Sequence, residues 1–208
     1  HMAPRFNLKK GDRFKIEKNE GLNNLKVHLT WDGEFQGKEL DLDESTFLLN
    51  DEGIIGNEAD FVFYNSDKRE EPYDKTKFGA KRNWLEQVRP LSEDGSVLGS
   101  IDKREGDEEG ELIDVCLDKV SPQVQEIVFV ATIDNPGATF GDVEHATITL
   151  INADSGEELC SYQLNEAFAS EDAVEFAKLF LNDEGEWEFE AIGVGHEGGL
   201  QTLIDLFA

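Results

Sequence analysis

Apolar and polar residues alternate along much of the chain, and this pattern predicts strands. Residues 25–31 place apolar side chains at every second position, and residues 187–191 do the same with acids between them. A period of two indicates a half-buried strand. Shorter apolar runs rich in β-branched and aromatic residues span 61–64, 112–117, 127–133, 146–151 and 159–164. The sequence therefore predicts a mainly β-structure.

Turn signals separate these runs and favour hairpins. The tetrapeptide Asn-Asp-Glu-Gly occurs at 50–53 and again at 182–185, each time after an apolar run. Short strands divided by such turns are typical of an all-β fold. We expect a β-sandwich of two mostly antiparallel sheets. Residues 172–181 fit either a strand or a helix.

The C-terminal segment has a different period. Leu200, Leu203, Ile204 and Phe207 recur at helical intervals, so a short C-terminal helix is expected within 198–207. The glycine-rich stretch 193–199 is interpreted as the turn that leads into this helix.

The 208 residues fit a single domain over 1–208. His1 and Met2 are interpreted as a cloning scar, and no run approaches the 18 apolar residues of a membrane span. Residues 66–96 break the strand rhythm, carry seven bases and seven acids, and predict an inserted loop with a helical turn near 83–88. This insertion is equally compatible with a partner surface and with a decorative loop.

The charge of the chain narrows the classes of function. It has 46 Asp and Glu against 19 Lys and Arg, a net charge of −27, and residues 105–208 contain 25 acids but two bases. Such a protein repels phosphate backbones, which argues against nucleic-acid binding. The acids either serve solubility or include a site for a divalent cation.

Signals for catalysis are weak. Gly-x-Ser-x-Gly, P-loop and His-Glu-x-x-His motifs are absent from the sequence. Cys116 and Cys160 are too few for a disulfide scaffold, and we expect buried thiols, although their number also allows one disulfide. No enzymatic activity is expected.

Two clusters of carboxylates are candidates for metal binding. One spans 102–111 and contains two glycines, and the other spans 41–45. If residues 40–43 are extended, Asp41 and Asp43 point to the same face. Calcium prefers six to eight oxygen ligands in flexible geometry, so carboxylate clusters suit it. Neither cluster has the glycine spacing of an EF-hand. A solvated acidic loop is the alternative interpretation.

Several segments, in order, resemble the tellurium-resistance TerD family. They include DLDESTFLLNDEG (41–53), ADFVFYN (59–65), GDEEGELIDVCLDKVSPQVQEIVFVATI (106–133), FGDVEHATITLINADSGEEL (140–159) and NDEGEWEFEAIGVGHEGGL (182–200). The similarity extends from about Lys26 onward. It implies a β-sandwich with calcium held in an acidic loop region at one end, and no known catalytic activity. Lys103 and Gly110 depart from the family pattern, so the chain resembles a divergent member.

The resemblance and the clusters together give a predicted ligand set for one or two Ca²⁺ ions. Asp60 is also compatible with capping a turn before a core strand. The predicted ligands are Asp41, Asp43, Asp60, Asn65, Asp102, Glu105, Asp107, Glu109 and Glu111.

The expected function is that of a non-enzymatic, calcium-binding stress-response protein that acts as a calcium-dependent scaffold or interaction module. The resemblance implies that other stress-response proteins are partners. It also implies a cytoplasmic location, including complexes at the inner face of the membrane. One alternative is an acidic module that docks a basic partner, with metal binding incidental. Another is a glycoside hydrolase that uses two carboxylates, although no spacing selects an acid/base pair.

Overall fold

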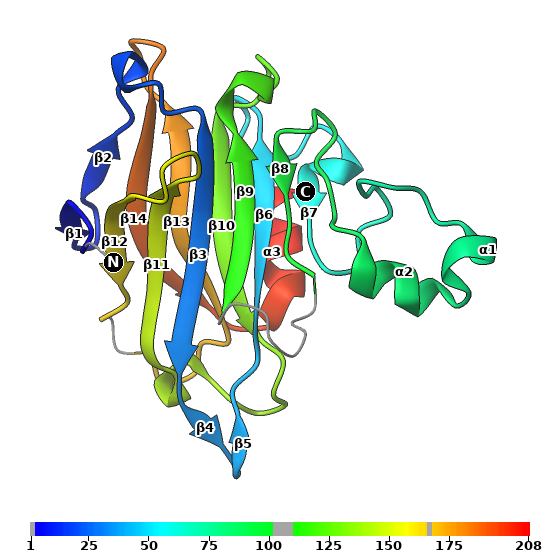
Figure 1. Ribbon diagram of the computed structural model, residues 1–208. Helices are drawn as coiled ribbons and strands as arrows, with labels where there is room; N and C mark the ends of the chain where they lie inside the picture. The colour runs from blue at the N-terminus through cyan, green and yellow to red at the C-terminus, as the bar shows by residue number, and fades with distance from the viewer. Residues whose placement is uncertain (1–2, 102–109, 166–167) are drawn as a thin grey trace.

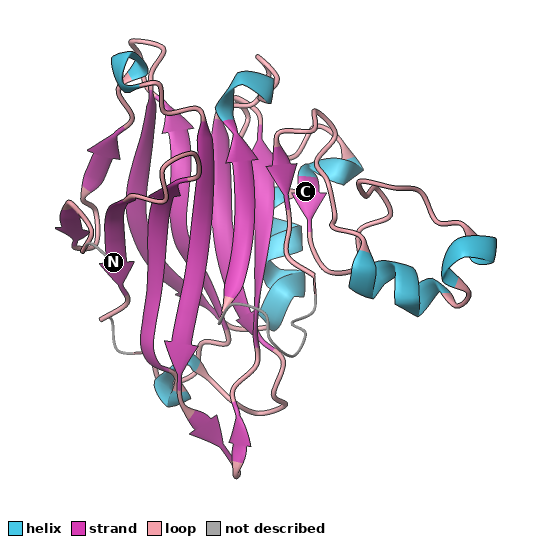
Figure 2. Ribbon diagram, viewed as in Figure 1, coloured by secondary structure: helices cyan, strands magenta, loops and turns pink. Residues whose placement is uncertain are grey.

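Two six-stranded sheets face each other in a sandwich (Figures 1 and 2). The computed structural model describes residues 3–101, 110–165 and 168–208. The first sheet has the order β1 (Phe6–Leu8), β12 (Glu158–Gln163), β11 (Glu144–Asn152), β3 (Asn24–Asp32), β9 (Glu111–Cys116) and β8 (Val97–Leu98). The second has the order β2 (Arg13–Lys15), β14 (Trp187–His196), β13 (Ala173–Leu181), β10 (Glu126–Ile133), β6 (Leu42–Leu49) and β7 (Phe61–Val62).

The strand pairing confirms the predicted β-sandwich. β1 pairs with β12 in parallel, and the other pairings within the two large sheets are antiparallel over the described residues. A small hairpin, β4 (Glu34–Phe35) and β5 (Lys38–Glu39), extends from one end of the sandwich, at the bottom of Figure 1.

The main core lies between the two sheets. Leu25, Val27 and Leu29 of β3 are buried, as the alternation of this segment predicts, and they pack in one cluster with Phe129 and Phe189 of the second sheet. Removal of this apolar surface from water is the main force that holds the sheets together.

A second cluster covers the outer face of the second sheet. Helix α3 (Gly199–Phe207) buries Leu203 and Phe207 there against Phe47 and Val130. The Phe47 ring stacks on Phe61 with centroids 4.5 Å apart and lies 4.9 Å from Phe207. The predicted C-terminal helix is therefore confirmed. Among the described residues, no helix is both long and apolar enough to cross a bilayer.

Residues 66–96, the segment predicted to be an insertion and called the insertion below, project to one side of the sandwich (Figure 1). The insertion contains helices α1 (Lys75–Phe78) and α2 (Lys81–Gln87), so the helical turn predicted near 83–88 is confirmed and begins earlier. The buried guanidinium of Arg69 donates hydrogen bonds to the carbonyls of Ser66, Leu85 and Val88, and it lies over the Trp84 ring. One side chain thus ties both ends of the insertion together.

Two local expectations change, and one open alternative is resolved. Residues 193–195 lie inside β14 and do not form a turn, because a register irregularity opposite them in β13 accommodates the glycines. Residues 173–181 form strand β13. Both cysteines are free; Cys160 is buried as expected, whereas Cys116 is only half-buried.

Candidate metal centre

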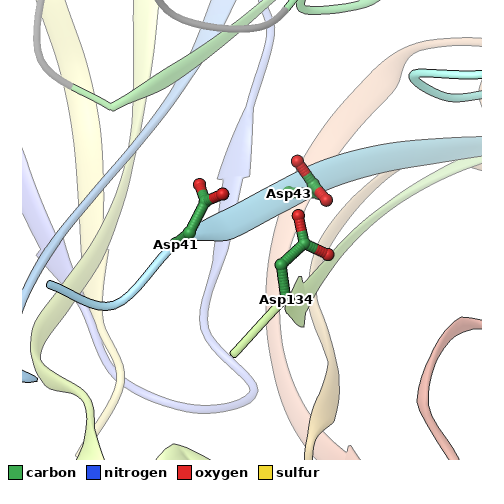
Figure 3. Close-up of side chains that lie close together, drawn as sticks. All are labelled: Asp41, Asp43 and Asp134. Carbon is green, nitrogen blue, oxygen red and sulfur yellow. The ribbon is translucent and has the colours of Figure 1, made fainter. Parts of the chain in front are cut away.

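Strands β6 and β10 bring three aspartates to one end of the second sheet (Figure 3). The two strands are antiparallel, with Leu42 opposite Ile133, and beyond this pair the Asp134 N–H donates to the Asp41 carbonyl at 2.8 Å. Asp41 and Asp43 are two positions apart, so their side chains leave the same face. We call Asp41, Asp43 and Asp134 the aspartate cluster.

The carboxylates of the aspartate cluster are close enough to share one ion. One oxygen from each side chain lies within 4.8 Å of the other two. Asp41 and Asp134 are exposed, whereas Asp43 is half-buried. In Figure 3, Asp43 and Asp134 point toward each other, and Asp41 stands beside them where the chain enters β6.

Asn135 fixes the chain that leads into the cluster. Its Oδ1 accepts a hydrogen bond from the Asp41 N–H at 2.7 Å, and its Nδ2 donates to the Glu39 carbonyl at 3.1 Å. The backbone on both sides of Leu40 is therefore held by the residue next to Asp134, which limits how far Asp41 and Asp134 can separate.

Ionisation of all three carboxyl groups in the aspartate cluster is electrostatically unfavourable. Burial raises the pKa of Asp43 to about 9, aided by a hydrogen bond with Asp134 and by the charges of Asp134, Glu111 and Asp41. Asp43 consequently keeps a proton at neutral pH when nothing else neutralises the group. A bound cation would replace that proton.

The donor set fits a hard divalent cation. All three side chains offer carboxylate oxygens, and this group contains no His or Cys among the described residues. Ca²⁺ binds carboxylates in either monodentate or bidentate mode and completes its shell with carbonyls and water. The exposed positions of Asp41 and Asp134 leave room for that water.

The predicted ligands are divided between two regions. Asp41 and Asp43 come together, and Glu111 lies near them, with its Oε1 accepting the Glu44 N–H at 3.4 Å. Asp60 and Asn65 lie elsewhere, before and after β7, which pairs with the far half of β6. Four further predicted ligands lie outside the described residues: Asp102, Glu105, Asp107 and Glu109.

Asp60 occupies a different acidic environment. It is the last residue of the 3-10 turn Glu58–Asp60 just before β7. The alternative that Asp60 caps this turn is wrong, because the Asn57 side chain is the cap and accepts a hydrogen bond from the Ala59 N–H. Burial and the charges of Asp94 and Glu93 raise the pKa of Asp60 to about 6. Asp60 lines a pocket of about 230 Å³ with Glu93, Asp94 and Ser121. Asn65 is exposed after β7.

Sequence reasoning missed Asp134. The available signal was an acid that directly follows the apolar run 127–133. Its pairing with Asp41 depends on the register between β6 and β10, two strands that are distant in the chain.

The fold and the cluster define an acidic β-sandwich with a carboxylate site at one end. Comparison with known proteins places it in a family: the TerD domain model matches residues 5–80 and 87–207, and the chain belongs to the TerD family. It is 34% identical over 203 residues to the tellurium resistance protein TerD of Serratia marcescens, covering 94% of this chain and 93% of that protein. It is 35% identical over 206 residues to general stress protein 16U of Bacillus subtilis (strain 168), covering 95% and 94%.

A solved structure has the same fold. The crystal structure of a homologue of the telluride resistance protein TerD from Streptomyces coelicolor A3(2) superposes with a TM-score of 0.62 at 20% identity, covering 88% of this chain and 96% of that one.

Proposed function

We propose that this protein is a non-enzymatic stress-response protein that binds Ca²⁺ at the aspartate cluster. The observation that supports this is the convergence of three carboxylates within 4.8 Å at the paired ends of β6 and β10. Like charges this close are costly unless a proton or a cation neutralises them. The relatives that are named as a tellurium resistance protein and a general stress protein support the stress-response part of this proposal.

Calcium suits this cluster better than other common divalent ions. Zn²⁺ favours nitrogen and sulfur ligands in tetrahedral geometry. Mg²⁺ needs near-ideal octahedral geometry and releases its water reluctantly. A site with three carboxylates, two of them exposed, instead offers the variable, partly hydrated shell that Ca²⁺ accepts.

Ca²⁺ binding would also change how readily the protein associates with other proteins. Ca²⁺ reduces the negative charge at one end of a chain whose net charge is −27. Lower repulsion there favours association with other proteins, which gives the calcium-dependent interaction role. This role is the functional consequence that we propose for the ion.

Calorimetric titration with Ca²⁺, Mg²⁺ and Zn²⁺, paired with thermal unfolding in EDTA and in excess Ca²⁺, tests the proposal. At free Ca²⁺ 100-fold above the dissociation constant, stabilisation of about 2.7 kcal/mol is expected, which raises the melting temperature by several degrees. Asp43→Asn and Asp134→Asn should weaken binding. Asp183→Asn, which removes the same charge from an exposed turn, is the matched control. Absence of both binding heat and a melting shift would refute the proposal.

A further inference from the structure

Arg89 attaches the insertion to the first sheet. Its side chain is 26% exposed, and its Nε donates to the Gly99 carbonyl at 2.8 Å. Its Nη2 donates to the carbonyls of Leu98 and Leu112 at 3.1 and 3.3 Å, and its Nη1 pairs with the Asp114 carboxylate. The planar fork of a guanidinium suits several acceptors at fixed positions. One side chain of the insertion therefore contacts both β8 and β9.

The backbone of Arg89 is held by the other end of the insertion. The Glu70 N–H donates to the Arg89 carbonyl at 3.0 Å, and the Leu91 N–H donates to the Lys68 carbonyl at 3.1 Å. We call this pairing of 68–70 with 89–91 the stem of the insertion. The Arg89 side chain extends from the stem to the sheet.

The start of β9 is held by side chains in place of a neighbouring strand. Over the described residues, β8 pairs with Asp114 and Val115 of β9 and does not reach Leu112. The Ser100 Oγ accepts the Leu112 N–H at 2.9 Å and donates to the Leu112 carbonyl at 2.7 Å, and Arg89 donates to the same carbonyl. Arg89 and Ser100 therefore fix this edge of β9 beyond the end of β8.

Glu111, directly before Leu112, brings a negative charge close to the aspartate cluster. Its charge contributes to the raised pKa of Asp43, and its Oε1 accepts the Glu44 N–H of β6 at 3.4 Å. A carboxylate near a cation site strengthens cation binding, and the gain depends on the distance between the charges. A shift of the Leu112 backbone would displace Glu111 and reduce that gain.

We propose that Arg89 is a positioning residue for the aspartate cluster and couples Ca²⁺ binding to the insertion. Arg89 holds the Leu112 carbonyl and thereby keeps the Glu111 carboxylate beside the cluster. The coupling is reciprocal, because a contact that favours Ca²⁺ binding is itself favoured by bound Ca²⁺. The insertion is then the part of the chain that responds to the ion. This inference rests on the proposed function and adds a means of regulation to it.

The sign of the effect separates positioning from charge. Removal of the Arg89 charge leaves this region more negative, which on charge alone strengthens Ca²⁺ binding. Loss of the Arg89 hydrogen bonds frees the start of β9, which weakens Ca²⁺ binding. The two explanations therefore predict opposite changes in affinity for Arg89→Met.

Calorimetric titration of the full chain with Ca²⁺ measures this change. Arg89→Met should raise the dissociation constant at least about fivefold. Arg5→Met is the matched control, because the Arg5 side chain is 35% exposed and pairs with Glu157 and Glu20 near the opposite edge of the first sheet. It should keep the wild-type affinity. Arg89→Met that binds Ca²⁺ as tightly as the wild type, or more tightly, overturns this inference.

Hydrogen exchange measures the reciprocal effect. In the wild type, saturating Ca²⁺ should slow exchange of the Glu70 and Leu91 amides, which form the stem. In Arg89→Met at saturating Ca²⁺, the ion is bound but this slowing should be lost. If Arg89 only supports the fold, its loss speeds exchange by the same factor with and without Ca²⁺, and that result would also overturn this inference.

Arg89→Lys is a second variant in case Arg89→Met folds poorly. Lysine keeps the charge but lacks the planar fork, so it should also weaken Ca²⁺ binding and reduce the Ca²⁺-dependent slowing in the stem. If Arg89→Lys is the variant that folds, wild-type affinity and slowing in it overturn this inference and leave the proposed function standing, because the wild type still binds Ca²⁺. A wild type that gives no binding heat overturns both.

Discussion

Carboxylate oxygens of Asp43 and Asp134 lie within 4.8 Å of each other across the ends of two neighbouring antiparallel strands. Burial and the neighbouring acids raise the pKa of Asp43 to about 9, so that at neutral pH its carboxyl group holds a proton where we propose that a cation binds. Competition between proton and cation makes the aspartate cluster sensitive to pH.

The first prediction concerns stability without calcium. Asp43 has a folded pKa of about 9, above its ordinary value of about 3.9, so the folded state holds a proton that the unfolded state releases. The stabilisation from this proton is complete below about pH 4 and is lost as pH rises toward 9. In EDTA, the stability of the wild type relative to Asp43→Asn should fall with pH by up to about 1.4 kcal/mol per unit. Urea denaturation at several pH values measures this difference.

Comparison with Asp43→Asn removes the contributions of other groups. Asp60 also has a raised pKa, but it titrates in both proteins and cancels in the difference. In saturating Ca²⁺, the ion replaces the proton, so the stability of the wild type relative to Asp43→Asn should depend less on pH. A difference that does not change with pH in EDTA would show that Asp43 is ionised throughout, contrary to the prediction.

The second prediction concerns Gly110, which precedes Glu111. Gly110 has φ +84°, and a Cβ at this position would lie 2.1 Å from the Leu29 carbonyl oxygen. Gly110→Ala therefore adds a backbone clash to the usual cost of about 1–2 kcal/mol for an L-residue in this conformation. We expect a loss above about 2 kcal/mol in urea denaturation and weaker Ca²⁺ binding, because Glu111 must move.

Gly185→Ala is the matched control for Gly110→Ala. Gly185 has a similar φ of +74°, but a Cβ there would meet no atom within 4 Å. Gly185→Ala should lower the free energy of unfolding by the conformational cost alone and should leave Ca²⁺ binding unchanged. Equal losses in both variants would mean that the contact with Leu29 is relieved without displacing Glu111.

The sequence predicts the sandwich where each strand has one buried face. Alternation in 25–31 identifies the inward residues of β3 directly. It fails for β13, where Val174 and Phe176 enter the main core and Ala173 lies under α3, so both faces are apolar and the period of two disappears. It also fails at Gly193, because a glycine at a strand irregularity has the same local signal as a turn.

The candidate site is predictable only in part, for a related reason. Asp41 and Asp43 follow from local spacing, because two extended positions on one face need no knowledge of the partner strand. Asp134 requires the register of β10 against β6, and the nearness of Glu111 to Asp43 requires the facing of β9 across the sandwich. Both relations are long-range and leave no local pattern.

The third prediction concerns Arg69 in the insertion. Its guanidinium donates to the carbonyls of Ser66, Leu85 and Val88, and a buried carbonyl that loses its donor costs about 1–3 kcal/mol. Arg69→Met should therefore open residues 66–96 locally while the sandwich stays folded. Hydrogen exchange should show faster exchange within this segment and unchanged protection in β3 and β10.

Arg82→Met is the control for Arg69→Met. The Arg82 side chain is 84% exposed and pairs with Glu86 one helical turn away on α2, a contact worth a few tenths of a kcal/mol. It should leave exchange in the insertion nearly unchanged. If Arg69→Met also leaves it unchanged, other contacts hold the insertion to the sandwich.

The last prediction compares two leucines on α3. Leu203 is fully buried against the outer face of the second sheet, whereas Leu206, three residues later, is 50% exposed. Replacement by Ala removes the same atoms from each at equal helix propensity. Leu203→Ala should cost about 2–5 kcal/mol in urea denaturation, because the vacated space is lined by Phe47 and Val130. Leu206→Ala should cost less than about 1 kcal/mol, since half of its side chain already meets water. Similar losses would mean that α3 adds stability as an independent helix and not by covering the sheet.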